Sequence, residues 1–181
     1  MKKITSVRTQ IILASVSALA LVAASPTPSE PGAGTPPPLA CVAPEFRQFD
    51  FWLGHWKVTN PQGVQVRTSE ITRVSLGCAV REQWQSASGG AGASINYYDA
   101  ADRQWHQDWV GGDSTILHLH GGLKDGAMIL TGETKGAKGP IVNRITCTPL
   151  PNGKVKQEWA VSDDAGRNWQ ISFLGTYKKE N

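Results

Sequence analysis

The chain has 181 residues, and its 18 basic and 15 acidic side chains give a formal net charge of +3. Three of the positive charges, Lys2, Lys3 and Arg8, lie at the N-terminus, so the rest of the chain is close to neutral. A near-neutral chain lacks the electrostatic attraction that drives most nucleic-acid binding, so we expect no nucleic-acid partner.

Residues 1–24 have the pattern of a cleavable signal peptide. A positive start is followed by an apolar run over 11–24 that only serines interrupt, and small residues precede a cleavage site between Ala24 and Ser25. The alternative is a membrane anchor, but about 14 apolar residues are fewer than the roughly 20 that span a bilayer. We therefore predict a periplasmic or secreted protein with no transmembrane segment in its mature form.

Residues 25–40 have the composition of a linker. They include six prolines and no aromatic residue, so they cannot bury enough apolar surface to offset their chain entropy. We predict an extended, mobile spacer. The remaining residues, 41–181, have the length of one domain that can bury a sizeable core.

Three cysteines, Cys41, Cys78 and Cys147, lie in this domain. In an oxidising compartment two of them can form a disulfide and the third stays free. We predict a Cys41–Cys78 bridge that fixes the start of the domain to the barrel wall. The alternative is that Cys41 is a lipidated N-terminal cysteine, because Leu39 and Ala40 before it resemble a lipobox.

The first predicted element covers 45–53, where closely spaced aromatic residues indicate one short helix or turn that plugs a barrel end. Ten segments with strand composition follow, separated by turns rich in Gly, Pro, Asn and Asp. These segments are 55–60, 64–75, 79–88, 93–99, 104–110, 115–121, 127–133, 141–148, 154–162 and 169–178. Short links between consecutive strands predict an all-β antiparallel meander, which at this size closes into a barrel like those of lipocalins and fatty-acid-binding proteins.

The last hairpin contains an Asp-box, S-x-D-x-G-x-x-W, from Ser162 to Trp169. In this motif the Asp carboxylate accepts hydrogen bonds from backbone N–H groups, and the Trp packs beneath the turn. The motif is a structural device, so it does not by itself indicate a glycosidase.

Alternate strand residues share one face, and this rule predicts the lining of the lumen. On several strands a polar residue lies between apolar residues on the inward face. The resulting candidate ligand-binding residues are Glu82, Trp84, Asn96, Tyr98, Trp105, Gln107, Trp109, Gln157 and Trp159. Buried polar groups need partners, so we expect either a small amphipathic ligand or polar groups that satisfy one another around trapped water.

The histidines suggest a possible metal site on the outer face. A hairpin loop over 111–113 would place His106 opposite His118, and Asp108 opposite Ile116. Residues paired in this way have Cβ atoms about 5 Å apart, close enough for two imidazoles to share a metal ion. The cluster would consist of His106, Asp108, His118 and His120. The alternative is a solvated polar face with no metal.

The sequence contains no nucleophile elbow, zinc-protease motif, P-loop or dinucleotide fingerprint, so no cofactor is predicted. Three functions remain open. The first is binding of a small, partly apolar ligand in the lumen. The second is hydrolase or isomerase activity that uses Glu82 as a base or the outer histidine face as a metal centre. The third is a structural role in the envelope.

Several motifs resemble the bacterial lipocalin-like, DUF1579-type family of exported proteins. They are FDFWLGHWKV at 49–58, NYYDA at 96–100, WHQDWV at 105–110, LHLHGG at 117–122, NRIT at 143–146 and the final DDAGRNW with GTY. Gly54, His55 and Trp56 also resemble the G-x-W signature of the first lipocalin strand, in which the Trp closes one barrel end. Lipocalins also have an Arg that closes the same end of the barrel. Lys178 or Lys179 is the basic residue of this sequence that comes nearest to that position. The resemblance implies the fold and export, and it implies no activity.

Overall fold

A computed structural model describes residues 40–180 of the chain. The predicted signal peptide, and the predicted linker except for Ala40, lie outside the described residues. Within the described part, no helix is both long enough and apolar enough to cross a membrane.

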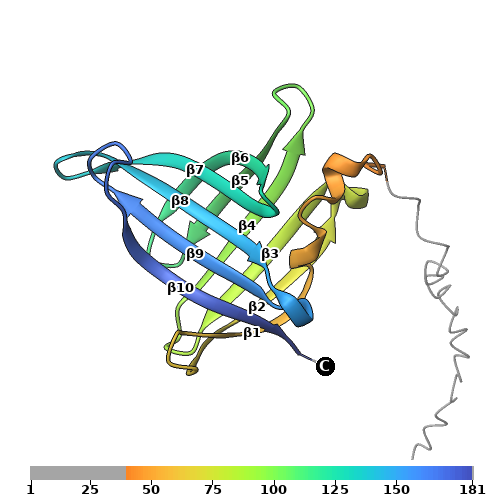
Figure 1. Ribbon diagram of the computed structural model, residues 1–181, viewed down its shortest axis with the longest axis horizontal. Coiled ribbons are helices and arrows are strands. Elements are labelled where there is room, and N and C mark those ends of the chain that lie inside the picture. Colours follow the sequence, from red (N-terminus) through yellow and green to blue (C-terminus); the bar gives the residue numbers. More distant parts are fainter. Residues whose placement is uncertain (1–39, 181) are drawn as a thin grey trace, which may run out of the picture. The chain divides into compact units, whose positions relative to one another are not determined.

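The described residues form an all-β barrel of ten strands, each hydrogen-bonded to its neighbours in the chain, with β1 paired to β10 to close the sheet (Figure 1). All pairings are antiparallel, which confirms the predicted meander. The strands are β1 (Gly54–Thr59), β2 (Gln65–Val74), β3 (Ala79–Ser86), β4 (Ala91–Asp99), β5 (Gln104–Gly111), β6 (Ile116–Lys124), β7 (Ala127–Gly136), β8 (Gly139–Pro149), β9 (Val155–Ser162) and β10 (Gln170–Lys179). Each begins and ends within a few residues of its predicted position.

The predicted register of the β5–β6 hairpin is wrong by one pair. Val110 pairs with Ile116, and the loop consists of residues 112–114. Two local features explain the shift. Ser114 adopts a left-handed backbone with φ of 69°, and the Asp113 carboxylate accepts the Thr115 N–H at 3.0 Å. The shift moves β6 by two residues relative to β5, and side chains two residues apart share a face. Every side chain therefore stays on its predicted face.

Successive connections of a meander lie at alternate ends of the barrel. We call one end the closed end: it holds residues 40–53 and the β2–β3, β4–β5, β6–β7 and β8–β9 connections. The other is the open end, which holds the β1–β2, β3–β4, β5–β6, β7–β8 and β9–β10 connections. In Figure 1 the orange N-terminal turns lie away from the loops that join β7 to β8 and β9 to β10.

The N-terminal segment forms two short 3-10 turns, η1 (Pro44–Arg47) and η2 (Asp50–Trp52), where one short helix or turn was predicted. The turns plug the closed end. Phe49 stacks on Trp52 with ring centroids 4.8 Å apart, and both side chains are fully buried. The Trp56 indole donates to the Trp52 carbonyl at 2.9 Å, so the plug is also hydrogen-bonded to β1.

A disulfide between Cys41 and Cys78 fixes the plug to the β2–β3 connection, as predicted. Arg47 reinforces this attachment, because its guanidinium donates to the carbonyls of Cys41 and Gly77. Cys147 is free and buried. A bridge that closes a loop of 37 residues stabilises the fold by about 4 kcal/mol in the loop-entropy account.

The Asp-box forms the β9–β10 turn in the predicted way. Asp164 accepts the backbone N–H groups of Arg167 and Asn168 at 3.0 and 2.8 Å, and the Trp169 indole donates to the Gly166 carbonyl. These bonds hold the Asp164 carboxylate in its charged form and lower its pKa to about 2, with the bonds to Asn168 as the largest cause.

Both ends of the described chain lie at the closed end. Ala40 donates its N–H to the carbonyl of Leu76, in the β2–β3 connection. Glu180 donates its N–H to the carbonyl of His55, near the start of β1. Of Lys178 and Lys179, it is Lys179 that lies over the Trp56 ring, and its ammonium nitrogen is 5.4 Å from the ring centroid.

Candidate functional site

A cavity of about 240 Å³ occupies the open half of the lumen. Most of its lining is aromatic or aliphatic, with a few polar side chains and the backbone of two loops. The lining side chains are Arg67, Glu82, Trp84, Gln107, Trp109, Leu117, Ile145, Gln157, Trp159 and Phe173, and the residues in or next to the β3–β4 and β5–β6 loops are Gly90, Ala91, Gly111, Gly112, Asp113 and Thr115. A cavity of this size is larger than the roughly 150 Å³ that holds a benzene ring.

The structure brings six of the nine predicted ligand-binding residues to this cavity. They are Glu82, Trp84, Gln107, Trp109, Gln157 and Trp159. Strand alternation places them there: they occupy alternate positions of β3, β5 and β9, and the outward neighbours carry the exposed or half-buried charges. The three indoles are half-buried, because no segment of residues 40–180 covers them.

Tyr98 and Trp105, which were also predicted as ligand-binding residues, are not among the residues that line the cavity. They point into the lumen at the closed end, where Tyr98 packs edge-to-face on Phe46 with centroids 5.3 Å apart. The Trp105 indole donates to Gln48 at 3.1 Å. The plug residues therefore occupy the space that a ligand would need.

Asn96 lies beside the cavity without lining it, and its hydrogen bonds fix the orientation of Gln107. The Asn96 amide donates to the carbonyl of Val80 at 3.1 Å and to Ser94 at 3.0 Å. Its oxygen accepts the Gln107 amide at 2.7 Å. The Gln107 side-chain oxygen is then buried with no donor among residues 40–180. Gln107, which lines the cavity, therefore carries a buried acceptor that is unused within the described part of the chain.

Glu82 is the one buried carboxyl group among the lining residues. Its two oxygens accept hydrogen bonds from Ser69 at 2.7 Å and from Ser94 at 3.4 Å. Burial raises the pKa of Glu82 to about 7, although the two serines and the Arg67 charge oppose this shift. The carboxyl group therefore changes its charge near neutral pH.

Gln157 lines the cavity together with Glu82, and the buried Cys147 lies beside Gln157. The Tyr177 hydroxyl donates to Gln157 at 2.8 Å, and the Gln157 amide lies 3.9 Å from the Cys147 sulfur. Burial raises the pKa of the Cys147 thiol and that of the Tyr177 hydroxyl, so both stay neutral. The wall around Glu82 thus contains neutral hydrogen-bonding groups.

Arg67 on β2 is the cavity residue that the prediction missed. Its guanidinium carbon lies 3.3 Å from the centroid of the Phe173 ring and 4.8 Å from that of Trp84. Alternation could have found it, because Arg67 shares its strand face with Ser69 and Ile71, which are buried. Burial lowers the pKa of Arg67, and the nearby Tyr177 and Glu82 oppose this effect.

The predicted histidine cluster separates into two pairs on the outer face. With the corrected register, His118 lies opposite Asp108 and binds it at 2.6 Å. His106 lies opposite His120, with ring centroids 6.2 Å apart. The four residues therefore do not converge on one point.

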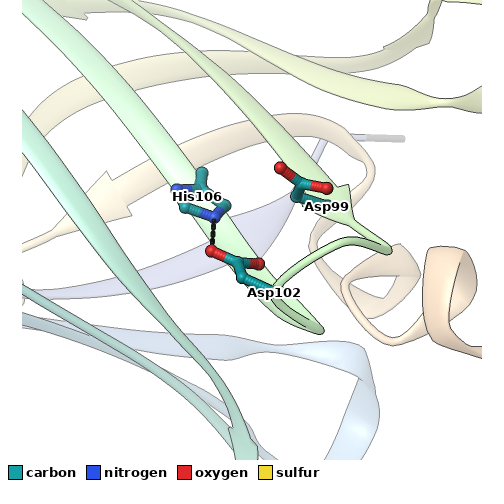
Figure 2. A group of neighbouring side chains, drawn as sticks. All are labelled: Asp99, Asp102 and His106. Carbon is teal, nitrogen blue, oxygen red and sulfur yellow. Dashed lines mark hydrogen bonds and ion pairs between the residues drawn. The ribbon is translucent and has the colours of Figure 1, made fainter.

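His106 instead contacts Asp102 in the β4–β5 turn at 2.9 Å, with Asp99 nearby (Figure 2). Asp99, Asp102 and His106 are the one set of three within residues 40–180 whose ligand atoms all lie within 4.8 Å of one another. The two carboxylates already accept the backbone N–H groups of Ala101 and Gln104. This arrangement is that of a capped turn.

In comparisons with known proteins, no family model matches the sequence and no curated protein matches it.

Proposed function

We propose that the protein binds a small, partly apolar molecule in the open half of its lumen. The observation that supports this best is a cavity of about 240 Å³ that is lined by half-buried indoles and by two residues with unpaired buried polar atoms. The Trp84 indole N–H and the Gln107 side-chain oxygen are buried, and neither has a partner among the described residues. Unpaired buried groups are costly, and a ligand that pairs with them removes this cost.

The size and lining of the cavity suit a molecule of two fused aromatic rings or a short alkyl chain. Trp84, Trp109 and Trp159 offer flat apolar surfaces, and Trp84 and Trp109 meet edge-to-face at 5.8 Å. Aromatic side chains supply large contact areas at small entropic cost. We therefore use 2-naphthalenemethanol, 1-octanol and indole as neutral test ligands.

Titration of each ligand, followed by tryptophan emission and by calorimetry, tests the proposal. We expect at least one to bind, and we expect Gly90→Phe to weaken it at least tenfold. A Cβ at Gly90 would meet Trp84 at an ordinary 3.7 Å, so the larger ring can enter the mouth without a backbone clash. The matched control is Gly122→Phe, because a Cβ at Gly122 meets no atom within 4 Å.

Two outcomes would contradict the proposal. In the first, no ligand changes the tryptophan emission or produces heat. In the second, a ligand binds equally well to the wild-type protein, Gly90→Phe and Gly122→Phe, which would place the site outside the lumen.

A second candidate function is acid–base catalysis by Glu82, and the specific observation in its favour is a pKa of about 7 inside the cavity. The test is release of 2-naphthol from 2-naphthyl acetate. Catalysis by Glu82 predicts a rate that changes with a midpoint near pH 7 and falls to the background in Glu82→Gln. Equal rates for the two proteins would exclude this reaction.

We further infer that the protein is exported and that it belongs to the DUF1579-type lipocalin-like family. The motifs named above support the family, and the Cys41–Cys78 bridge supports an oxidising compartment. Expression of the full chain in a bacterium tests export. We expect the mature protein in the periplasmic fraction, beginning at Ser25, whereas an uncut chain in the cytoplasm would contradict export.

A further inference from the structure

We propose that the ligand of this cavity is a small organic anion, whose charged group binds Arg67 while its apolar part contacts the aromatic rings of the lining. This inference rests on the proposed function, since it names the class of molecule that the same cavity takes.

The first step is the state of Arg67. Its guanidinium carbon lies over the Phe173 ring, 3.3 Å from the centroid, and over the Trp84 ring, 4.8 Å from the centroid. Within residues 40–180 the guanidinium forms no hydrogen bond and no ion pair with a carboxylate. A partly desolvated cation with five unused donors is the side chain best suited to bind a carboxylate, sulfonate or phosphate group.

The second step is the apolar surface beside Arg67. The guanidinium carbon is 3.3 Å from the centroid of Phe173 and 4.8 Å from that of Trp84, and both rings line the cavity. An anionic group bound to Arg67 therefore places the apolar part of the same molecule against aromatic side chains.

The third step is the charge balance of the cavity. Arg67 is the one cationic side chain in its lining, and Glu82 and the loop residue Asp113 are the acidic ones. Glu82 is bound to Ser69 and Ser94, and it is predominantly neutral below about pH 7. Asp113 accepts the Thr115 N–H in its own turn. Arg67 is thus left without a partner of opposite charge at mildly acidic pH.

The fourth step compares Arg67 with other arginines of the barrel. Arg47 donates to backbone carbonyls, Arg73 pairs with Asp50, and Arg144 lies over the Trp169 ring at 3.9 Å. Arg67 also contacts aromatic rings, but it lines the cavity, and its donors have no acceptor among residues 40–180. Its charge is therefore available to a bound molecule.

The test compares two probes of the same shape, 2-naphthoate and 2-naphthalenemethanol, by calorimetry at pH 6. We expect the wild-type protein to bind the anion at least tenfold more tightly than the alcohol. Arg67→Gln should remove this preference, so that the variant binds the two probes with affinities that differ by less than about threefold. The matched control is Arg167→Gln, an exposed arginine in the β9–β10 turn at the same end, which should keep the preference.

The outcomes separate the two proposals. If both probes bind equally well to the wild-type protein, or if Arg67→Gln keeps the preference for the anion, the anion inference is wrong and lumenal binding stands. If neither probe binds, the anion inference fails together with lumenal binding of naphthalene-sized molecules. Should Arg67→Gln not fold, the ratio of the two wild-type affinities and the weaker preference expected of Arg67→Lys decide the matter.

Discussion

The two ends of the barrel carry the same kind of side chain in different surroundings. At the closed end Trp52, Trp56 and Trp105 are at most 1 % exposed, because the two N-terminal turns fill the space between them. At the open end Trp84 and Trp109 are half-buried around a cavity. The comparison teaches that an inward aromatic row becomes core where a chain segment covers it and a candidate site where none does.

The largest effect should come from truncating an indole at each end. We expect Trp52→Ala to lower the free energy of unfolding by about 3–5 kcal/mol, because it leaves an enclosed void in the plug. Trp84→Ala should cost less than half as much, since its indole borders space that is already open. Urea unfolding measures both. Equal losses would mean that the open end is packed as firmly as the closed one.

The disulfide offers a second way to separate the ends. Cys41→Ala together with Cys78→Ala should lower the free energy of unfolding by about 4 kcal/mol, because the unfolded chain gains the freedom of a 37-residue loop. The affinity for 2-naphthalenemethanol should stay within about twofold, since the bridge lies at the closed end. Reduced wild-type protein is the control. A large loss of affinity would show that the plug shapes the cavity.

Much of this contrast could be predicted from the sequence, and the missing part has a physical cause. Strand composition and turn residues indicated the ten strands, and alternation indicated the inward face of six cavity residues, although Arg67 was missed. Alternation carries no information on depth along the barrel axis, so Trp105 and Trp109 looked equivalent although one contacts the plug and the other the cavity. The left-handed Ser114 that shifts the β5–β6 register leaves no mark in the sequence, because glycine is the residue expected there.

The pH dependence of the free energy of unfolding tests the polar part of the cavity wall at the open end. Glu82 has its pKa raised from 4.5 to about 7, so the folded state favours the neutral acid. The neutral acid therefore stabilises the folded state fully below about pH 4.5, and this stabilisation is lost as the pH rises through about 7. The loss in the free energy of unfolding is about 3 kcal/mol. Glu82→Gln should therefore show a smaller loss of stability between pH 5 and pH 8.

Urea unfolding at several pH values measures this difference, and Glu133→Gln is the control because Glu133 is exposed. If the wild-type protein and Glu82→Gln lose the same stability over this range, Glu82 is already ionised in the folded protein. The cavity would then be more hydrated than the hydrogen bonds of Glu82 suggest.

The smallest effect should come from the Asp-box, which orders an open-end loop without covering the cavity. Asp164→Ala should lower the Tm by a few degrees at pH 7, because the turn loses the acceptor of two backbone N–H groups. Its pKa is lowered to about 2, so the difference should shrink as the pH falls from about 4 to 2. Asp163→Ala is the matched control, and equal shifts for the two variants would contradict this role.

The position of both chain ends beside the plug has a practical consequence for handling the protein. When residues 40–180 are attached to a surface, a bead or a fluorescent fusion through either terminus, the attachment lies at the closed end, beside Ala40 or Glu180. The rim formed by Gly90 and Gly112 then faces the surrounding solution. Immobilised protein can therefore report equilibrium affinities without steric interference from its own attachment.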